Sequence, residues 1–296
     1  MMCSPRIMNH VYGAIEGRGP QMTRRAMFGA LGAAALVAST AGSVSAAPVP
    51  QVAPPEGPIV DLTHVLRAGF PVWPGSQSFE MRNLAQIGGG TGSLGSLAPG
   101  ATSVFYKNEL RLDEHTGTHI DAPAHASADG ITVEQIPPRD LVAPIAVIDI
   151  AARAHTDNDA LLTRQDIVDW ESDHGTLPDR CLVAMHSGWA DRVGHPGAFV
   201  NVDTAGVQRT PGFDPDAVDF LLRERDIVGL GSDTLSIDAG RSTTFGAHLG
   251  ALGAGKYAVE VLANLSQIPP AGATVMVGAP THAGGSGGPC RVLAWI

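Results

Sequence analysis

The chain has 296 residues and a formal net charge of −10, with 44% hydrophobic and 5% aromatic residues. This length suits one large globular domain or two small ones. The acidic balance argues against nucleic acid as a partner, because phosphate binding requires a basic surface. The 36 glycines and 22 prolines favour many turns and short strands over a helical bundle.

The N-terminal region has the residue order of an export signal. Twin arginines at 24 and 25 precede an apolar run over 26–38 and the small-residue sequence VSA at 44–46. The run is too short to span a bilayer, which needs about 20 apolar residues. We therefore expect residues 1–46 to be a twin-arginine-type signal peptide, with 1–21 an upstream extension. The mature protein is then expected in the periplasm or outside the cell, without a membrane anchor.

The segment after the signal leads into the folded part. Residues 47–57 are proline-rich and predict an extended leader, and 58–296 shows no composition break that would divide it. A first strand is expected over 59–66. A glycine- and serine-rich insertion at 87–103 is expected to be mobile, and the strand-like run 104–112 follows it.

The remainder of the chain alternates apolar runs with a few helical patterns. Thr163 and Asp214 are candidate N-caps, and Gly175 is a helix stop. Strands are predicted over 144–152, 181–189, 227–233, 273–280 and 290–296, and helices over 163–175 and 214–226. Buried strands alternating with helices predict a single α/β domain over 58–296.

Two cysteines remain after removal of the signal. Cys181 and Cys290 could form a disulfide in an exported protein. Cys181 also lies in the apolar run CLVAMH, which is equally consistent with a buried thiol. The disulfide and the free thiol therefore remain alternatives.

Residues 113–130, DEHTGTHIDAPAHASADG, concentrate three histidines, His115, His119 and His125, around Asp121. Imidazole nitrogen and carboxylate oxygen suit zinc, manganese and iron. Because TGT at 116–118 is a poor helix core, we predict a loop or short turn here. Spacing alone leaves a metal site and a polar surface loop as alternatives.

The run from His115 to His125 is a complete H-T-G-T-H-x-D-x-P-x-H motif. It resembles the signature of the metal-dependent cyclase superfamily, which includes bacterial kynurenine formamidases and isatin hydrolases. Three further segments support the resemblance: VDLTHVL…FPVWPG, the pair His248 and Glu260 twelve residues apart, and the closing GGSGGPCRVLAWI. Together they cover about residues 58–296. The resemblance implies a swivelling β/β/α-type α/β domain with a mixed sheet and few helices.

The resemblance also implies a metal site. One metal would be bound by His115, His119 and Asp121. Asp121 and Glu260 would also reach a second metal, which His248 would hold. One or two divalent ions per subunit, zinc or manganese, are therefore expected. Water activated by such a site attacks amide carbonyls.

Further roles come from the same resemblance. His125 would be the catalytic acid/base, with a third ligand or a ligand-orienting residue as the alternatives, and Trp73 would line the substrate pocket. Trp189 follows a buried strand, where pocket residues of α/β folds lie, and is also expected to contact substrate. Substrate binding, ligand orientation and turn formation stay open for Asp233, Ser236 and Asp238.

The implied function is an exported metal-dependent hydrolase that cleaves the C–N bond of a small aryl formamide or cyclic amide. Hydrolysis of N-formylkynurenine, a step of tryptophan catabolism, is the best-known activity of the family. Isatin or lactone ring opening is the alternative, and export favours it because tryptophan breakdown is normally intracellular. A non-catalytic metal- or ligand-binding protein is the second alternative, although a binder needs no general base. The resemblance further suggests a homodimer or homotetramer acting on a small molecule.

Overall fold

The computed structural model of the protein describes residues 57–88, 103 and 105–296. The expected signal peptide, nearly all of the proline-rich leader and the insertion residues 89–102 lie outside this range. None of the helices in the described part is long and apolar enough to cross a membrane. All described residues belong to one unit with its own core.

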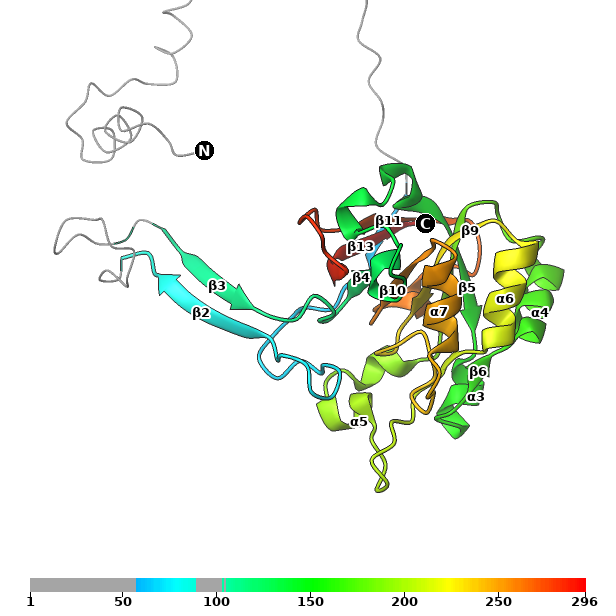
Figure 1. The fold of residues 1–296 in the computed structure, drawn as a ribbon, viewed down its shortest axis with the longest axis horizontal. Helices are drawn as coiled ribbons and strands as arrows, with labels where there is room; N and C mark the ends of the chain where they lie inside the picture. Colours follow the sequence, from blue (N-terminus) through cyan, green and yellow to red (C-terminus); the bar gives the residue numbers. More distant parts are fainter. Residues whose placement is uncertain (1–56, 89–102, 104) are drawn as a thin grey trace, which may run out of the picture. The chain divides into compact units, whose positions relative to one another are not determined.

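A nine-stranded mixed sheet forms the centre of this unit (Figure 1). Its middle is parallel, and antiparallel strands extend it on both sides. In spatial order the strands are β1 (Ile59–Asp61), β13 (Arg291–Trp295), β11 (Ala273–Gly278), β5 (Val142–Asp149), β7 (Cys181–His186), β9 (Ile227–Ser232), β10 (Tyr257–Glu260), β4 (His119–Asp121) and β12 (Gly287–Pro289). This arrangement confirms the expected α/β class with a mixed sheet.

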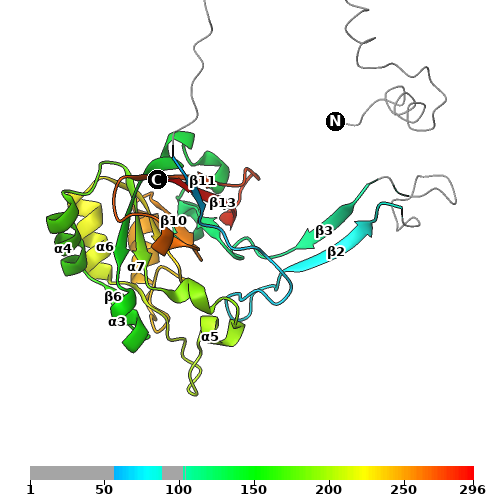
Figure 2. The ribbon, with the colours of Figure 1, turned by 180° about the vertical axis from the view of Figure 1, so that it is seen from behind.

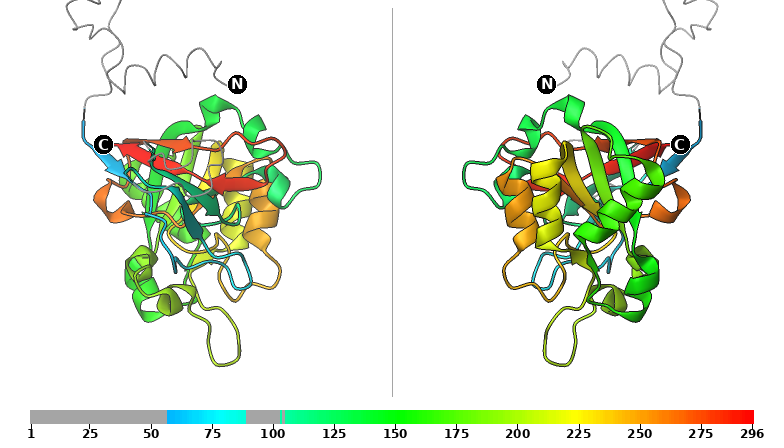
Figure 3. Two further views of the ribbon diagram at one scale, coloured as in Figure 1. Left: turned by 90° about the vertical axis from the view of Figure 1, so that its left-hand side faces the viewer. Right: turned by 90° about the vertical axis from the view of Figure 1, so that its right-hand side faces the viewer.

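Helices cover one face of the sheet (Figure 3). Three of them lie beside one another: α4 (Arg164–His174), α6 (Pro215–Glu224) and α7 (Gly246–Gly253). The short helices α3 (Ala151–Thr156) and α5 (Pro196–Val200) follow β5 and precede β8, respectively. Strands such as β7 and β9 are buried on both faces, which explains their continuous apolar sequences.

The helix ends agree with the capping signals. The Thr163 hydroxyl accepts from the Asp166 amide, and the Asp166 carboxylate accepts from the Thr163 amide, which is a capping box. Gly175 follows α4 with a φ of 87°. Asp214 caps α6 by accepting from the Asp216 amide. Both predicted helices are thus confirmed.

Two smaller sheets lie outside the main one. Strands β2 (Glu80–Ala85) and β3 (Lys107–Arg111) pair only with each other and leave both faces largely exposed (Figure 2). Strands β6 (Leu161–Leu162) and β8 (Gly212–Phe213) form a short parallel pair. The β2–β3 hairpin therefore buries little apolar surface.

The structure corrects several expectations. The strand expected over 59–66 ends at Asp61, and the one expected over 181–189 ends at His186, where a 3₁₀ turn begins shortly afterwards. Strand β4 lies in the segment predicted as a loop. Cys181 and Cys290 are buried free thiols, which excludes a disulfide between them. Burial raises the pKa of the Cys181 thiol to about 12, so it stays protonated.

Candidate metal centre

The pairing of β4 with β10 brings three ionisable side chains onto one face of the sheet. Glu260 lies directly opposite His119, and Ala258 lies opposite Asp121. Residues two apart on a strand share a face, so Asp121 lies beside the His119–Glu260 pair. The intervening Ile120 points to the opposite face, into the core. Alternation along a three-residue strand thus separates the polar cluster from the apolar core.

Helix α7 supplies His248 to the same cluster. The Asp238 carboxylate accepts hydrogen bonds from the backbone amides of Ala247 and His248, at 2.8 and 3.1 Å, at the start of the helix. It also accepts from Nδ1 of His248 at 2.7 Å. Because Nδ1 faces Asp238, Nε2 of His248 is the nitrogen that faces the cluster, and it lies 3.2 Å from Oε1 of Glu260.

His119 is fixed in the same manner by a backbone group. Its Nδ1 donates to the carbonyl of Gly117 at 2.8 Å, so Nε2 is again the nitrogen that faces the cluster. This nitrogen lies 3.2 Å from Oδ1 of Asp121 and 3.4 Å from Oε2 of Glu260. Although burial opposes it, the two carboxylates raise the pKa of His119 to about 10, so a metal bound at Nε2 would displace a proton.

The cluster has the donor set that a divalent cation requires. Asp121 is completely buried, Glu260 nearly so, and two buried carboxylates are costly without compensating positive charge. Nε2 of His119 and Oδ2 of Asp121 are buried without a hydrogen-bond partner. One ligand atom from each of His119, Asp121 and Glu260 fits within 4.8 Å of the others. The residues therefore fit a metal ion, with Nε2 of His248 at the edge of the same cluster.

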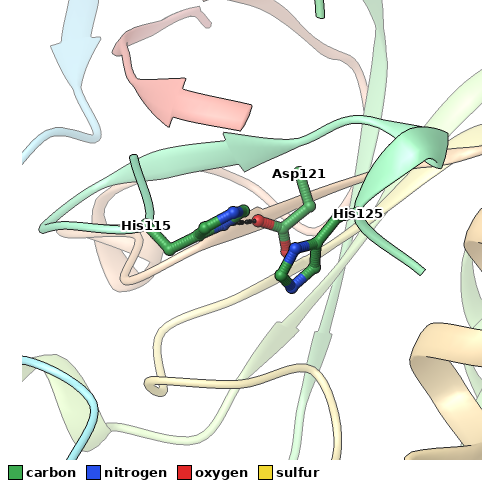
Figure 4. Close-up of side chains that lie close together, drawn as sticks. All are labelled: His115, Asp121 and His125. Atoms are coloured by element: carbon green, nitrogen blue, oxygen red, sulfur yellow. Dashed lines mark hydrogen bonds and ion pairs between the residues drawn. The ribbon is translucent and has the colours of Figure 1, made fainter. Parts of the chain in front are cut away.

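His115 and His125 complete the histidine group (Figure 4). Nδ1 of His115 lies 2.6 Å from Oδ1 of Asp121. His125, on the 3₁₀ turn Pro123–His125, makes no side-chain hydrogen bond in the described structure, and its ring centroid is 3.9 Å from that of His115. Desolvation in the pocket lowers the pKa of His125, while the Asp121 carboxylate opposes this shift. The structure also allows His125 as a ligand together with His115 and Asp121.

A cavity of about 620 Å³ opens over this cluster. One wall is apolar and includes Trp73 and Phe245, whose ring centroids are 6.4 Å apart, together with Leu235 and Leu249. Trp189 does not line the cavity. It is fully buried, and its indole N–H donates to the carbonyl of Phe199, so its position favours packing behind the wall over substrate contact.

The sequence left the roles of Asp233, Ser236 and Asp238 open, and the structure gives each a different position. Asp233 accepts from the amides of Ser187 and Trp189 and fixes the loop after β7. Ser236 lines the cavity and accepts from the Asp238 amide, and Asp238 orients His248. Sequence reasoning missed Phe245 as a wall residue. The available signal was its position three residues before His248. The first turn of a helix that carries a metal ligand lies beside the metal site, so residues there line the cavity.

Comparison with known proteins gives consistent matches. Residues 60–239 match the model of the family described as "Putative cyclase". An isatin hydrolase of Roseibium aggregatum is 37% identical over 202 residues, covering 65% of this chain and 75% of that protein. A kynurenine formamidase of Salinibacter ruber is 27% identical over 238 residues, covering 79% of this chain and 96% of that protein.

Solved structures agree with these sequence matches. The structure of isatin hydrolase A from Ralstonia solanacearum superposes with a TM-score of 0.72 at 35% identity. The match covers 81% of this chain and 92% of that one, so it extends across the sheet and helices described above.

Proposed function

The chain belongs to the cyclase family, and from this membership and the geometry of the centre we propose a metal-dependent hydrolase that cleaves the C–N bond of a small aromatic amide. The aromatic residues that line the cavity support an isatin-type cyclic amide as the substrate class. The observation that carries the proposal is the convergence of His119, Asp121, Glu260 and His248 beside an aromatic wall.

The chemistry divides between the metal site and the protein side chains. A divalent ion in this site supplies Lewis acidity, which acidifies a coordinated water and polarises a carbonyl. Asp121 lies centrally, because its carboxylate faces His119 on one oxygen and His248 on the other. That arrangement fits one ion or two ions that share a carboxylate, and both zinc and manganese accept these donors.

His125 is the side chain best placed to move the proton. Its ring lies in the cavity beside that of His115 and makes no side-chain hydrogen bond in the described chain. Because its pKa lies below the ordinary value, the imidazole is neutral near pH 7 and accepts a proton from the attacking water. It then returns this proton to the nitrogen as the C–N bond breaks, so the nitrogen becomes a neutral amine, which stays attached to the product when a cyclic amide is opened.

The lining of the cavity favours a neutral, planar substrate. Among the described residues, none of those that line the cavity is Lys or Arg. The sequence of the insertion 89–102 contains neither residue type. Asp113 and Glu114 add negative charge at the lining. The carboxylate of N-formylkynurenine would therefore lack a cationic partner, whereas neutral isatin needs none. The aromatic pair Trp73 and Phe245 suits a fused ring system.

Turnover of two substrates tests this proposal. We expect the zinc- or manganese-loaded protein to open isatin with a kcat/KM at least 100-fold above that for N-formylkynurenine, and chelator treatment to abolish both reactions. A preference for N-formylkynurenine would instead support the formamidase alternative.

The same preparation tests the non-catalytic alternative. Elemental analysis should find at least one equivalent of zinc or manganese, and Glu260→Ala should lose metal and activity together. A metal-loaded protein without turnover on formamides, isatins and lactones would identify a binding protein.

A further inference from the structure

A hydrogen-bonded chain of side chains leads away from His115, on the side opposite Asp121. Nε2 of His115 lies 3.0 Å from the hydroxyl of Ser286. That hydroxyl lies 2.6 Å from Oε2 of Glu114. The other carboxylate oxygen, Oε1, lies 2.5 Å from Nε2 of His282. None of these contacts is needed for the chemistry proposed above, so they require their own explanation.

The direction of the hydrogen bonds follows from the chemistry of the groups. A serine hydroxyl has one proton to donate, and an ionised carboxylate only accepts. Ser286 therefore donates to Glu114 and must accept from His115. That arrangement keeps a proton on Nε2 of His115, so Nδ1, which donates to the carboxylate of Asp121, is the nitrogen that would give up its proton to bind a metal. Nδ1 is the atom that lies 2.6 Å from Oδ1 of Asp121.

The backbone holds Ser286 in place for this contact. Its amide donates to Oε2 of Glu114 at 3.3 Å, and its carbonyl accepts from the Ala122 amide at 2.8 Å, directly after β4. The next residue, Gly287, lies opposite Asp121 in the β4–β12 pair. A Cβ at Gly287 would come within 2.8 Å of the His115 ring. The glycine thus makes room for the imidazole that Ser286 orients.

From these contacts we propose that Ser286, itself held by Glu114, is a positioning residue that makes His115 bind the metal through Nδ1. His119 and His248 present Nε2, because their Nδ1 atoms donate to Gly117 and Asp238. The inference rests on the proposed metal site and extends it: a serine in the glycine-rich turn directly before β12 would set the orientation of a ligand 171 positions away.

A spectroscopic measurement on the parent protein tests the nitrogen assignment. Long-range ¹H–¹⁵N NMR of the zinc-loaded protein should show His115 with a proton on Nε2 and zinc on Nδ1, and His119 and His248 with the reverse. Zinc on Nε2 of His115 would overturn the proposal. Failure of the parent protein to bind zinc would instead overturn the proposed function, so the two outcomes are distinguishable.

Substitution tests the role of the hydroxyl. Ser286→Ala should weaken Zn²⁺ affinity, measured by competition with a chromophoric chelator, by about 10- to 100-fold, as expected for loss of a partner that orients a ligand. Ser286→Thr keeps a hydroxyl and should retain affinity within a few-fold of the parent. The exposed Ser78→Ala is the matched control and should leave affinity unchanged.

The thermal midpoint of the metal-free proteins separates positioning from general stabilisation. We expect Ser286→Ala and the parent to unfold at similar temperatures without zinc. A lowered midpoint combined with unchanged Zn²⁺ affinity would show a structural role only and would contradict the proposal.

Discussion

Three of the imidazoles around Asp121 are each held by a different kind of acceptor. A backbone carbonyl holds His119, a carboxylate holds His248 and a hydroxyl holds His115. Such partners set which nitrogen faces a metal and keep the ring from rotating. A change to the acceptor should therefore alter metal affinity even though every ligand is still present.

Asp238→Asn is expected to weaken metal binding by about 10-fold. The carboxylate accepts from two backbone amides and from Nδ1 of His248, and an amide NH₂ in its place must face one of those donors. Chelator competition with Zn²⁺ measures the effect. Asp214→Asn, which changes a helix cap on α6 away from the site, is the control. Equal affinity in the two variants would contradict an orienting role for Asp238.

His125→Ala is expected to lower kcat by about 10²- to 10⁴-fold, the usual contribution of a general acid–base. Bound metal should remain at the parent level, since His119, Asp121, Glu260 and His248 are retained. Steady-state kinetics and elemental analysis on the same sample measure both quantities. Loss of metal together with activity would show that His125 is a ligand. His155→Ala, an exposed histidine on α3, is the control.

The motif and the His248–Glu260 spacing pointed to residues that the structure does bring together. The partners that orient them were harder to foresee. Ser286 reaches His115 only because β12 pairs with β4, and nothing in the local sequence reveals that pairing. Trp189 shows the opposite case: its position after a strand suggested the pocket, but the side chain packs among Phe70 and Phe199 instead.

Among the elements, the three-residue strand β4 joins distant segments of the chain. It pairs with β10 on one side and β12 on the other, so segments from three distant parts of the chain meet at it.

The β2–β3 hairpin, in contrast, pairs with no strand of the main sheet. Two-stranded hairpins are marginally stable alone, and Met81 and Leu110, paired across this one, are each more than half exposed. We propose that this hairpin contacts a second copy of the chain, in agreement with the homodimer or homotetramer expected from the family.

Replacing Met81 and Leu110 with serine should disrupt the proposed interface and lower the mass of the protein in solution. The two substitutions remove the exposed apolar pair and leave the Arg82–Glu109 ion pair in place. Light scattering after size-exclusion chromatography gives the mass. Val168→Ser, at an exposed site on α4, is the control. An unchanged mass in the double variant, or a monomeric parent, would contradict this interface.

Elements with strong local signals were predicted well. Capping residues and continuous apolar runs located α4, α6, β5, β7 and β9 within a few residues. Strand β4 was missed because a three-residue strand is too short to show alternation, and its sequence HID carries polar residues that suggest a loop. Helix α7 was missed because glycines at 246, 250 and 253 weaken the helical pattern.

For the whole molecule, we propose export by the twin-arginine pathway. The sequence order of arginines, apolar run and VSA at 44–46 supports it. In a bacterial host with this pathway, the full chain should yield a periplasmic protein that begins at Ala47. Replacing both Arg24 and Arg25 with lysine should keep the precursor in the cytoplasm. Intact-mass spectrometry of each fraction measures the outcome, and unimpaired export of the variant would contradict the pathway.

The pairing of β4 with β10 also has a consequence for folding. His119 and Asp121 meet Glu260 only after about half of the chain has been synthesised between them and the sheet has closed. An unfolded chain therefore offers separate, weak donors, whereas the closed sheet offers the full set. The compartment in which the sheet closes would then decide which ion is acquired. For a protein carried across a membrane already folded, that choice would be made among cytoplasmic metals, before the molecule reaches the place where it works.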